Sequence, residues 1–174
     1  MYKILIVDDE SIEREGISFL IEKYKLPLEV AQATNGKTAL EYMRTHPIDI
    51  LLTDVKMPQM DGLELARHTF EKYPDVRILV FSAYGEFEFA KKAMAAQAVS
   101  YLLKPIEVDE FQRVMAQILA QCDELAEKKK DEQQRGEEYR QQLLFRLVTG
   151  TGLGKAHSTE ELFPGQTLCL LHVQ

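Results

Sequence analysis

The sequence predicts an α/β fold in which five parallel strands form a doubly wound sheet, followed by an extended C-terminal helix. Short apolar runs alternate with segments whose apolar residues recur every three or four positions, which indicates βαβ units with right-handed crossovers. The runs are apolar nearly throughout, as expected when helices cover both faces of a parallel sheet. From residue 108 to about residue 150 the helical pattern continues without another strand.

Five segments are predicted to be strands because each is a short apolar run bounded by charged or turn-forming residues. In chain order they are Tyr2–Val7, Leu28–Ala33, Ile48–Thr53, Arg77–Phe81 and Val99–Leu103.

Four helices are predicted from apolar residues at helical spacing. They are Ser11–Tyr24, Thr38–Arg44, a helix opened by the turn Met60-Asp61-Gly62, and Glu86–Ala96. Ser11 or Asp9 is expected to cap the first helix. The apolar residues of these patterns include Ile12, Ile17, Leu20 and Ile21 in the first helix and Leu65, Ala66 and Phe70 in the third.

The C-terminal helix begins with heptad spacing, in which Phe111, Met115, Ile118, Cys122 and Leu125 alternate by fours and threes. Charged residues and a glycine then occupy the same frame, so a weak coiled coil and a solvated connector helix both remain open. We predict a domain over residues 1–122, a connector helix over 123–150, and in 151–174 a linker and the start of an incomplete further domain. That last region holds an apolar run, Thr167–Val173, predicted to be a strand.

The composition is that of an ordinary globular protein, with 174 residues and a formal net charge of −7. The negative charge argues against direct binding of nucleic acid or an anionic membrane. The two cysteines have no metal-binding spacing and are expected to be reduced thiols. No apolar run is long enough to span a bilayer and no signal peptide pattern is present, so a cytoplasmic location is expected.

Charged and polar side chains stand at the predicted carboxyl ends of four strands. Asp8 and Asp9 follow the first, Asp54 the third, Ser82 the fourth and Lys104 the fifth. Because the carboxyl ends of parallel strands meet at one edge of an open sheet, these groups are expected to lie together, where such folds place their chemistry.

Carboxylates gathered at this edge would repel one another, by ~4 kcal/mol for two charges about 4 Å apart at an effective dielectric near 20. Such a cluster takes up protons or holds a cation. Oxygen ligands at an open edge suit Mg²⁺, which retains waters and accepts one or two carboxylates together with a phosphate oxygen. The sequence therefore predicts a phosphoryl-acceptor and Mg²⁺ site.

The same residues resemble a known family. The runs Ile4-Leu5-Ile6-Val7-Asp8-Asp9-Glu10, Leu51-Leu52-Thr53-Asp54-Val55-Lys56-Met57-Pro58, Ser82-Ala83-Tyr84 and Tyr101-Leu102-Leu103-Lys104-Pro105 resemble the receiver domain of two-component response regulators. The resemblance covers roughly residues 1–122 and implies a flavodoxin-like sheet with strand order 2-1-3-4-5. Ser82 stands where many relatives carry threonine, which keeps the hydroxyl.

The resemblance implies a role for each matching residue. Asp54 would accept a phosphoryl group from a sensor histidine kinase, and Lys104 and Ser82 would contact that group. Mg²⁺ would be held by Asp8, Asp9, Asp54 and the backbone carbonyl of Lys56. Lys56 and Tyr84 would tune the lifetime of the phosphoryl group. The Lys104–Pro105 peptide bond is expected to be cis.

Phosphorylation is expected to act as a switch because the phosphoryl group adds about −1.5 to −2 of charge. Movement of Ser82 toward it would let Tyr101 turn inward and change the face formed by the fourth helix, fifth strand and fifth helix. A homodimer is expected through that face or through the connector helix.

The run Ser82–Met94 resembles receivers of longer regulators that end in an AraC-type DNA-binding domain. The chain is therefore expected to be a piece of such a transcription regulator that ends before its output domain. Nothing in the sequence itself resembles a DNA-reading helix, so DNA would be bound only through that absent domain.

Other functions fit less well. A flavin or nucleotide binder needs a Gly-rich loop where the acidic Asp8-Asp9-Glu10 stands. An aspartate-based phosphatase needs a second acid where Lys56 stands, so no turnover of an external substrate is expected beyond self-phosphorylation and autodephosphorylation at Asp54. The glycines between Gly150 and Gly154 lack the full phosphate-loop pattern. The main alternative is a phosphorylation-independent dimerisation module of a transcription regulator.

Overall fold

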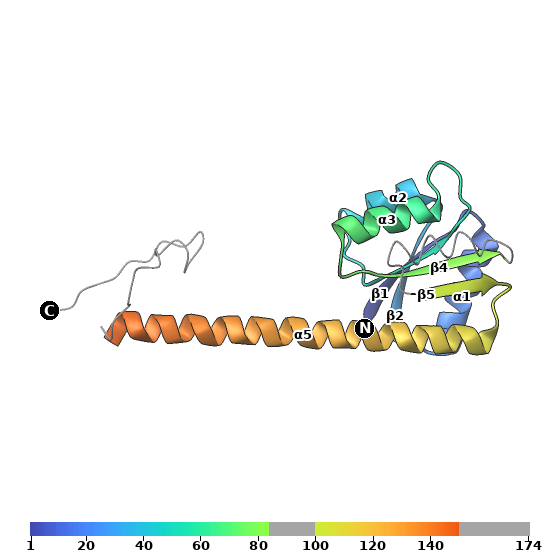
Figure 1. Ribbon diagram of the computed structural model, residues 1–174. Coiled ribbons are helices and arrows are strands. Elements are labelled where there is room, and N and C mark those ends of the chain that lie inside the picture. Colours follow the sequence, from blue (N-terminus) through green and yellow to red (C-terminus); the bar gives the residue numbers. More distant parts are fainter. Residues whose placement is uncertain (84–99, 150–174) are drawn as a thin grey trace. The chain divides into compact units, whose positions relative to one another are not determined.

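The computed structural model describes residues 1–83 and 100–149 of the chain (Figure 1). The described strands form one five-stranded parallel sheet in the order β2-β1-β3-β4-β5, which confirms the predicted fold class. The strands are β1 (Tyr2–Val7), β2 (Leu28–Ala33), β3 (Ile50–Asp54), β4 (Arg77–Ala83) and β5 (Ser100–Lys104).

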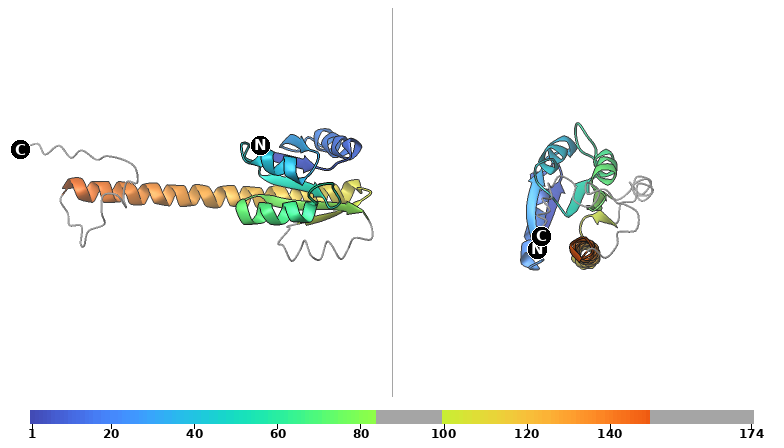
Figure 2. Two further views of the ribbon diagram at one scale, coloured as in Figure 1. Left: turned by 90° about the horizontal axis from the view of Figure 1, so that it is seen from above. Right: turned by 90° about the vertical axis from the view of Figure 1, so that its left-hand side faces the viewer.

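The described helices cover the two faces of the sheet. They are α1 (Ser11–Lys23), α2 (Gly36–Met43), α3 (Gly62–Lys72) and α5 (Val108–Thr149). Side chains of α1 and of the first turns of α5 form one core with the sheet, and α2 and α3 form the other. Figures 1 and 2 show α2 and α3 side by side over their face.

Alternate residues of each strand enter the two cores. In β1, Ile4 and Ile6 face α1 and α5, whereas Leu5 and Val7 face α2 and α3. All four side chains are completely buried. Full burial of an aliphatic side chain contributes about 1.5–3 kcal/mol, so this two-sided packing explains why the strands are apolar throughout.

The carboxyl ends of three strands differ from the predicted bounds. β3 includes Asp54, β4 extends to Ala83 and β5 extends to Lys104, because each of these residues still pairs with its neighbour across the sheet. Asp54 lies opposite Phe81, and Ala83 lies opposite Lys104. Asp54, Ser82 and Lys104 therefore project from the last two residues of their strands, where pairing fixes the backbone. At the other end, β3 begins at Ile50, not at Ile48 as predicted.

Two apolar residues of the predicted helical patterns are exposed. Ile12 is 80% exposed and Phe70 is 38% exposed. Ile12 precedes the buried Ile17 by five residues, which at 3.6 residues per turn places it about 140° away around the helix. In α3, Thr69 is buried and the adjacent Phe70 is not.

The helix starts also differ from prediction. The N-cap of α1 is Glu10, with no side-chain hydrogen bond, so neither Ser11 nor Asp9 caps it. α2 starts at Gly36, earlier than predicted, because Asn35 and Thr38 form a reciprocal capping box. The predicted helix Glu86–Ala96 lies outside the described residues.

The first half of the predicted heptad seam belongs to the core. Phe111, Met115, Ile118 and Cys122 are buried among sheet and α1 side chains, so their spacing marks the face that α5 packs against the sheet, not a coiled coil. The chain divides into two compact units, Met1–Leu125 and Ala126–Gln174, and α5 runs through the division. The predicted strand Thr167–Val173 lies outside the described residues.

Among the described residues, none of the helices is both long and apolar enough to cross a membrane.

Candidate functional site

Polar side chains from four strands meet at the carboxyl edge of the sheet. Asp8 follows β1 directly, while Asp54, Ser82 and Lys104 lie in the last two residues of β3, β4 and β5. The register aligns Val7 with Thr53, Asp54 with Phe81, and Ser82 with Leu103, which brings these ends level. Asp8, Asp54 and Ser82 are buried, with exposed fractions of 1%, 7% and 0%.

The ammonium of Lys104 joins the two buried carboxylates. Its Nζ atom lies 2.9 Å from an oxygen of Asp8 and 3.1 Å from an oxygen of Asp54. The same nitrogen lies 4.7 Å from the centre of the Phe81 ring, in cation–π contact. Lys104 thus neutralises carboxylates from two different strands at one point.

The electrostatics of Asp54 reflect its position. Burial raises the pKa of the Asp54 carboxyl and Asp8 adds to the rise, although the positive charge of Lys104 opposes both. Burial alone would lower the pKa of Lys104, but its hydrogen bonds to the two carboxylates outweigh burial and raise it. The ammonium therefore stays charged, and Asp54 is a carboxylate whose ionised form depends on a nearby cation.

The turn after Asp54 holds the carboxylate in place. The backbone N–H of Lys56 donates to the second oxygen of Asp54 at 3.0 Å. The N–H of Gly62 donates to the carbonyl of Val55 at 3.0 Å, and Asp61 caps α3 through Glu64. A Cβ atom on Gly62 would lie 1.8 Å from the carbonyl oxygen of Asp54, so only glycine fits there.

Hydrogen bonds within the loop and from α1 fix the conformation of the loop after β1. Asp8 accepts the N–H of Glu10 on one carboxylate oxygen at 2.8 Å, and the guanidinium of Arg14 donates to the backbone carbonyl of Asp8 at 2.7 Å. The sequence reading missed Arg14, Phe81 and Gly62 as parts of this site. For Arg14, the sequence feature that could have indicated a role in the site was its position one helical turn after the acidic loop.

The donor set fits a divalent cation. Two carboxylates converge on one positive group, the Lys104 ammonium, and Mg²⁺ needs only one or two carboxylates beside waters and a phosphate oxygen. Asp9 is exposed. Residues 1–83 and 100–149 contain no cluster of three or more His, Cys, Asp or Glu side chains placed to bind a metal.

The remaining predicted residues are placed as follows. The Lys104–Pro105 bond is cis, the isomer that the resemblance implied. Tyr101 packs partly buried against the core on the α2 and α3 face. Among the described residues its hydroxyl, which is buried, has no hydrogen-bond partner. Tyr84 lies outside the described residues.

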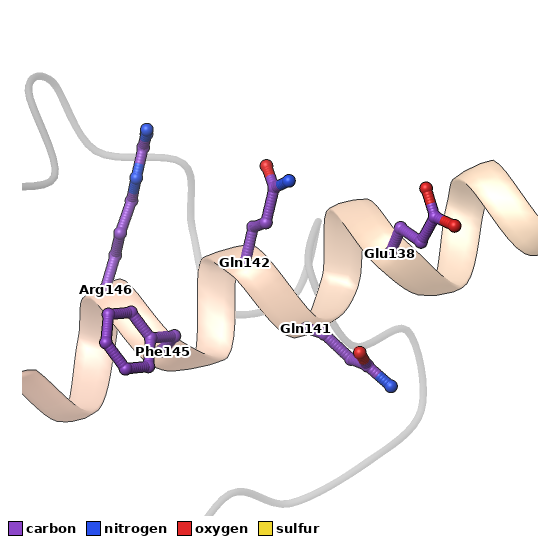
Figure 3. A pocket seen from close by; sticks show the side chains of 5 residues that line it. All are labelled: Glu138, Gln141, Gln142, Phe145 and Arg146. Atoms are coloured by element: carbon purple, nitrogen blue, oxygen red, sulfur yellow. The ribbon is translucent and has the colours of Figure 1, made fainter.

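A hollow in the second unit does not rival this site. It is lined by side chains that all come from the last turns of α5, and Figure 3 shows their polar ends pointing in several directions. They are Glu138, Gln141, Gln142, Phe145 and Arg146. No described residue of another element adds a catalytic or metal-binding group to them.

Comparison with known proteins places the chain among signalling proteins. The sequence model of the response regulator receiver domain matches residues 4–116. The chain is 41% identical over 122 residues to the transcriptional regulatory protein YesN of Bacillus subtilis, covering 70% of this chain and 33% of YesN. It is 31% identical over 118 residues to the transcriptional regulatory protein DegU of Brevibacillus brevis, covering 66% and 50%.

Solved structures agree. The REC domain of AraT, a response regulator from Geobacillus stearothermophilus, is 38% identical with a TM-score of 0.65, covering 74% of this chain and 98% of that one. A two-component transcriptional regulator AraC from Clostridium phytofermentans is 35% identical with a TM-score of 0.66, covering 71% and 97%.

The chain spans between a third and a half of the length of the first curated relatives it matches. Its matched part has the fold, the acidic edge and the lysine that the sequence predicted. The chain belongs to the family of response regulator receiver domains, the phosphoacceptor modules of two-component signalling.

Proposed function

We propose that Asp54 accepts a phosphoryl group from the phosphohistidine of a sensor histidine kinase in a Mg²⁺-dependent reaction. One observation carries the proposal: at the open edge of the sheet, the ammonium of Lys104 lies 2.9 Å from the carboxylate of Asp8 and 3.1 Å from that of Asp54. That edge is where open α/β folds bind their ligands.

In the proposed reaction, an oxygen of Asp54 forms a bond to phosphorus while the bond from phosphorus to the histidine nitrogen breaks. The nitrogen keeps the electron pair of that bond. The hydrogen bond from the Lys56 N–H holds one oxygen of Asp54 and leaves the other to attack. Lys104 exchanges its contact with Asp54 for one with a phosphoryl oxygen, and Ser82 donates its hydroxyl to another.

Asp8, Asp9, Asp54 and the carbonyl of Lys56 would hold the metal ion. When bound, Mg²⁺ offsets the repulsion between the carboxylates and the phosphoryl group and aligns the transferring oxygens. Asp8 then serves both as a ligand and, in the free protein, as a partner of Lys104. We propose no turnover of an external substrate, only loss of the phosphoryl group from Asp54 itself by autodephosphorylation.

The test is intact mass after incubation with Mg²⁺ and acetyl phosphate, beside an Asp54→Asn variant and a sample with a chelator. We expect one added phosphoryl group in the wild type and none in either control. An unmodified wild type, also after incubation with active histidine kinases, would remove the proposed function and leave a phosphorylation-independent dimerisation module as the better reading.

We further propose that phosphorylation acts through Ser82 and Tyr101 on the face that β5 and α5 share with the predicted fourth helix. Tyr101 already packs against the core with a buried hydroxyl, so a change in its position changes the packing of that face. Dimerisation through this face or the connector helix is tested by light scattering with and without beryllofluoride. A monomer under both conditions would contradict it.

The output is proposed from the relatives alone. YesN, DegU and the regulator from Clostridium phytofermentans carry transcriptional regulation in their names. We propose that this chain controls an AraC-type DNA-binding domain of the whole regulator, in the cytoplasm, where its kinase would meet it. Promoter binding by the whole regulator with and without Asp54→Asn tests this control.

A further inference from the structure

We infer that Arg14 is a positioning residue for the metal-binding loop, a role that rests on the proposed function of Asp54. Arg14 lies on α1, behind the loop formed by Asp8, Asp9 and Glu10. Its Nη1 atom donates to the backbone carbonyl of Asp8 at 2.7 Å, and its Nε atom donates to the side-chain oxygen of Gln32 on β2 at 3.2 Å. The guanidinium therefore ties the loop to two other elements.

The Asp8 carbonyl is the critical contact because it belongs to the peptide group that joins Asp8 to Asp9. The N–H of Asp8 donates to Ala33 at 3.3 Å, and its carboxylate accepts from Glu10 and Lys104. These contacts fix the backbone N–H and the carboxylate of Asp8. The Arg14 hydrogen bond fixes the following peptide plane and hence the direction in which the chain presents Asp9.

The Arg14 hydrogen bond matters because the start of α1 lacks the side-chain hydrogen bond that an N-cap residue usually makes. Glu10 occupies the N-cap of α1 without a side-chain hydrogen bond. Hydrogen bonds also fix the position of Arg14 itself. The side-chain oxygen of Gln32 accepts from the guanidinium, and the side-chain nitrogen of Gln32 donates to the hydroxyl of Ser18 at 3.0 Å. That hydroxyl in turn donates to the backbone carbonyl of Arg14 at 2.8 Å. Arg14, Ser18 and Gln32 thus form a closed brace under the acidic loop.

A positioning role and a purely electrostatic role of Arg14 predict opposite changes in Mg²⁺ affinity when the residue is removed. As a positive charge near two carboxylates, it would weaken binding of a cation, so its removal would tighten Mg²⁺ binding. As a positioning residue, Arg14 aligns the metal ligands of the acidic loop, so its removal would weaken Mg²⁺ binding. Loss of such outer hydrogen bonds lowers metal affinity by about tenfold or more. The sign of the change in Mg²⁺ affinity therefore separates the two roles.

The experiment is calorimetric titration of the full chain with MgCl₂ for the wild type, Arg14→Lys, Arg14→Gln and Gln32→Ala. Lysine keeps the charge but cannot make the two-pronged contact. We expect about tenfold weaker Mg²⁺ binding in both Arg14 variants and a smaller loss in Gln32→Ala. The matched control is Arg67→Gln, which removes an exposed arginine that, among the described residues, pairs with Glu71 on its own helix; this variant should bind as the wild type does.

Phosphorylation by acetyl phosphate provides a second readout. In Arg14→Lys the Mg²⁺ concentration needed for half the maximal rate should rise about tenfold, while the rate at saturating Mg²⁺ should return to near the wild-type value. A merely structural role would lower the saturated rate with no change in the Mg²⁺ dependence.

Unchanged or tighter Mg²⁺ binding in folded Arg14→Lys and Arg14→Gln would overturn the inference. If Arg14→Gln does not fold, Arg14→Lys and Gln32→Ala decide the result. A wild type that neither binds Mg²⁺ nor gains a phosphoryl group would instead remove the proposed function, so the two failures are distinguishable.

Discussion

Gly62 offers the most direct test of how the turn after β3 positions Asp54. A Cβ atom at this position would lie 1.8 Å from the carbonyl oxygen of Asp54, 2.8 Å from its carbonyl carbon and 2.8 Å from Oγ1 of Thr53. Cβ atoms essentially never approach other heavy atoms within 3.0 Å, so Gly62→Ala must move either Asp54 or the start of α3 by more than about 1 Å. The nearest atom, the Asp54 carbonyl oxygen, belongs to the backbone and cannot rotate away.

The magnitude follows from two opposing effects. Insertion of a methyl group into packed surroundings destabilises a protein by typically 1–3 kcal/mol, and rigid neighbours favour the upper end. Alanine at a helical position recovers up to about 1 kcal/mol relative to glycine. We expect Gly62→Ala to be about 2 kcal/mol less stable than the wild type. A shift of about 1 Å at a reacting group slows a reaction by about 100-fold, so phosphorylation by acetyl phosphate should slow to that extent.

Gly16 provides the matched control. It lies inside α1, and a Cβ atom there would meet nothing within 4 Å. Gly16→Ala should therefore stabilise the protein by about 0.5–1 kcal/mol and leave the phosphorylation rate unchanged. Urea denaturation of the two variants, with intact-mass time courses for the rate, measures both effects. A Gly62→Ala variant as stable and as fast as the wild type would refute the close packing of Asp54 against α3.

Three further changes test other contacts. Lys104→Met removes the cation between two buried carboxylates, so without Mg²⁺ we expect a loss of roughly 3 kcal/mol in urea denaturation that Mg²⁺ partly restores; no loss would contradict the ion pairs. The hydrogen bond from Tyr2 to Asp123, at 2.6 Å, is the main cause that raises the pKa of Tyr2 to about 12. Its stabilisation is complete below pH 10 and is lost between about pH 10 and pH 12, so the wild type should lose stability more steeply there than Tyr2→Phe; equal slopes would exclude this contact. Tyr101→Phe should be at least as stable as the wild type, since the buried hydroxyl has no partner within the described residues, and a loss above about 1 kcal/mol would contradict that.

The sequence predicted that polar side chains gather at one edge of the sheet, for a geometric reason. In a parallel sheet the carboxyl ends of all strands lie at one edge, so Asp8, Asp54, Ser82 and Lys104 had to gather once the strands were assigned. What spacing could not predict is which of them touch. The bridge from Lys104 to two carboxylates depends on side-chain rotamers and on the ring of Phe81 beneath the ammonium.

The errors in the fold have equally specific causes. A core-facing helix and a coiled coil share the same spacing of three and four, so the apolar residues of α5 from Phe111 to Cys122 looked like a dimer seam. Ile12 was counted in the apolar pattern of the first helix, but apolar character alone does not bury a side chain, and this isoleucine faces solvent. The capping box at Asn35 and Thr38 was readable in principle, but the helix was expected to begin at Thr38 and not at Gly36.

The central claim is that Asp54 is the phosphoacceptor. The most direct measurement is to phosphorylate the chain with acetyl phosphate and Mg²⁺, reduce it with borohydride, and sequence the peptides by tandem mass spectrometry. Reduction converts an aspartyl phosphate to homoserine, so we expect homoserine at position 54 and at no other acidic residue, in an amount that matches the phosphorylated fraction. Homoserine at Asp8 or Asp9, or a phosphorylated chain with an unmodified Asp54, would contradict it.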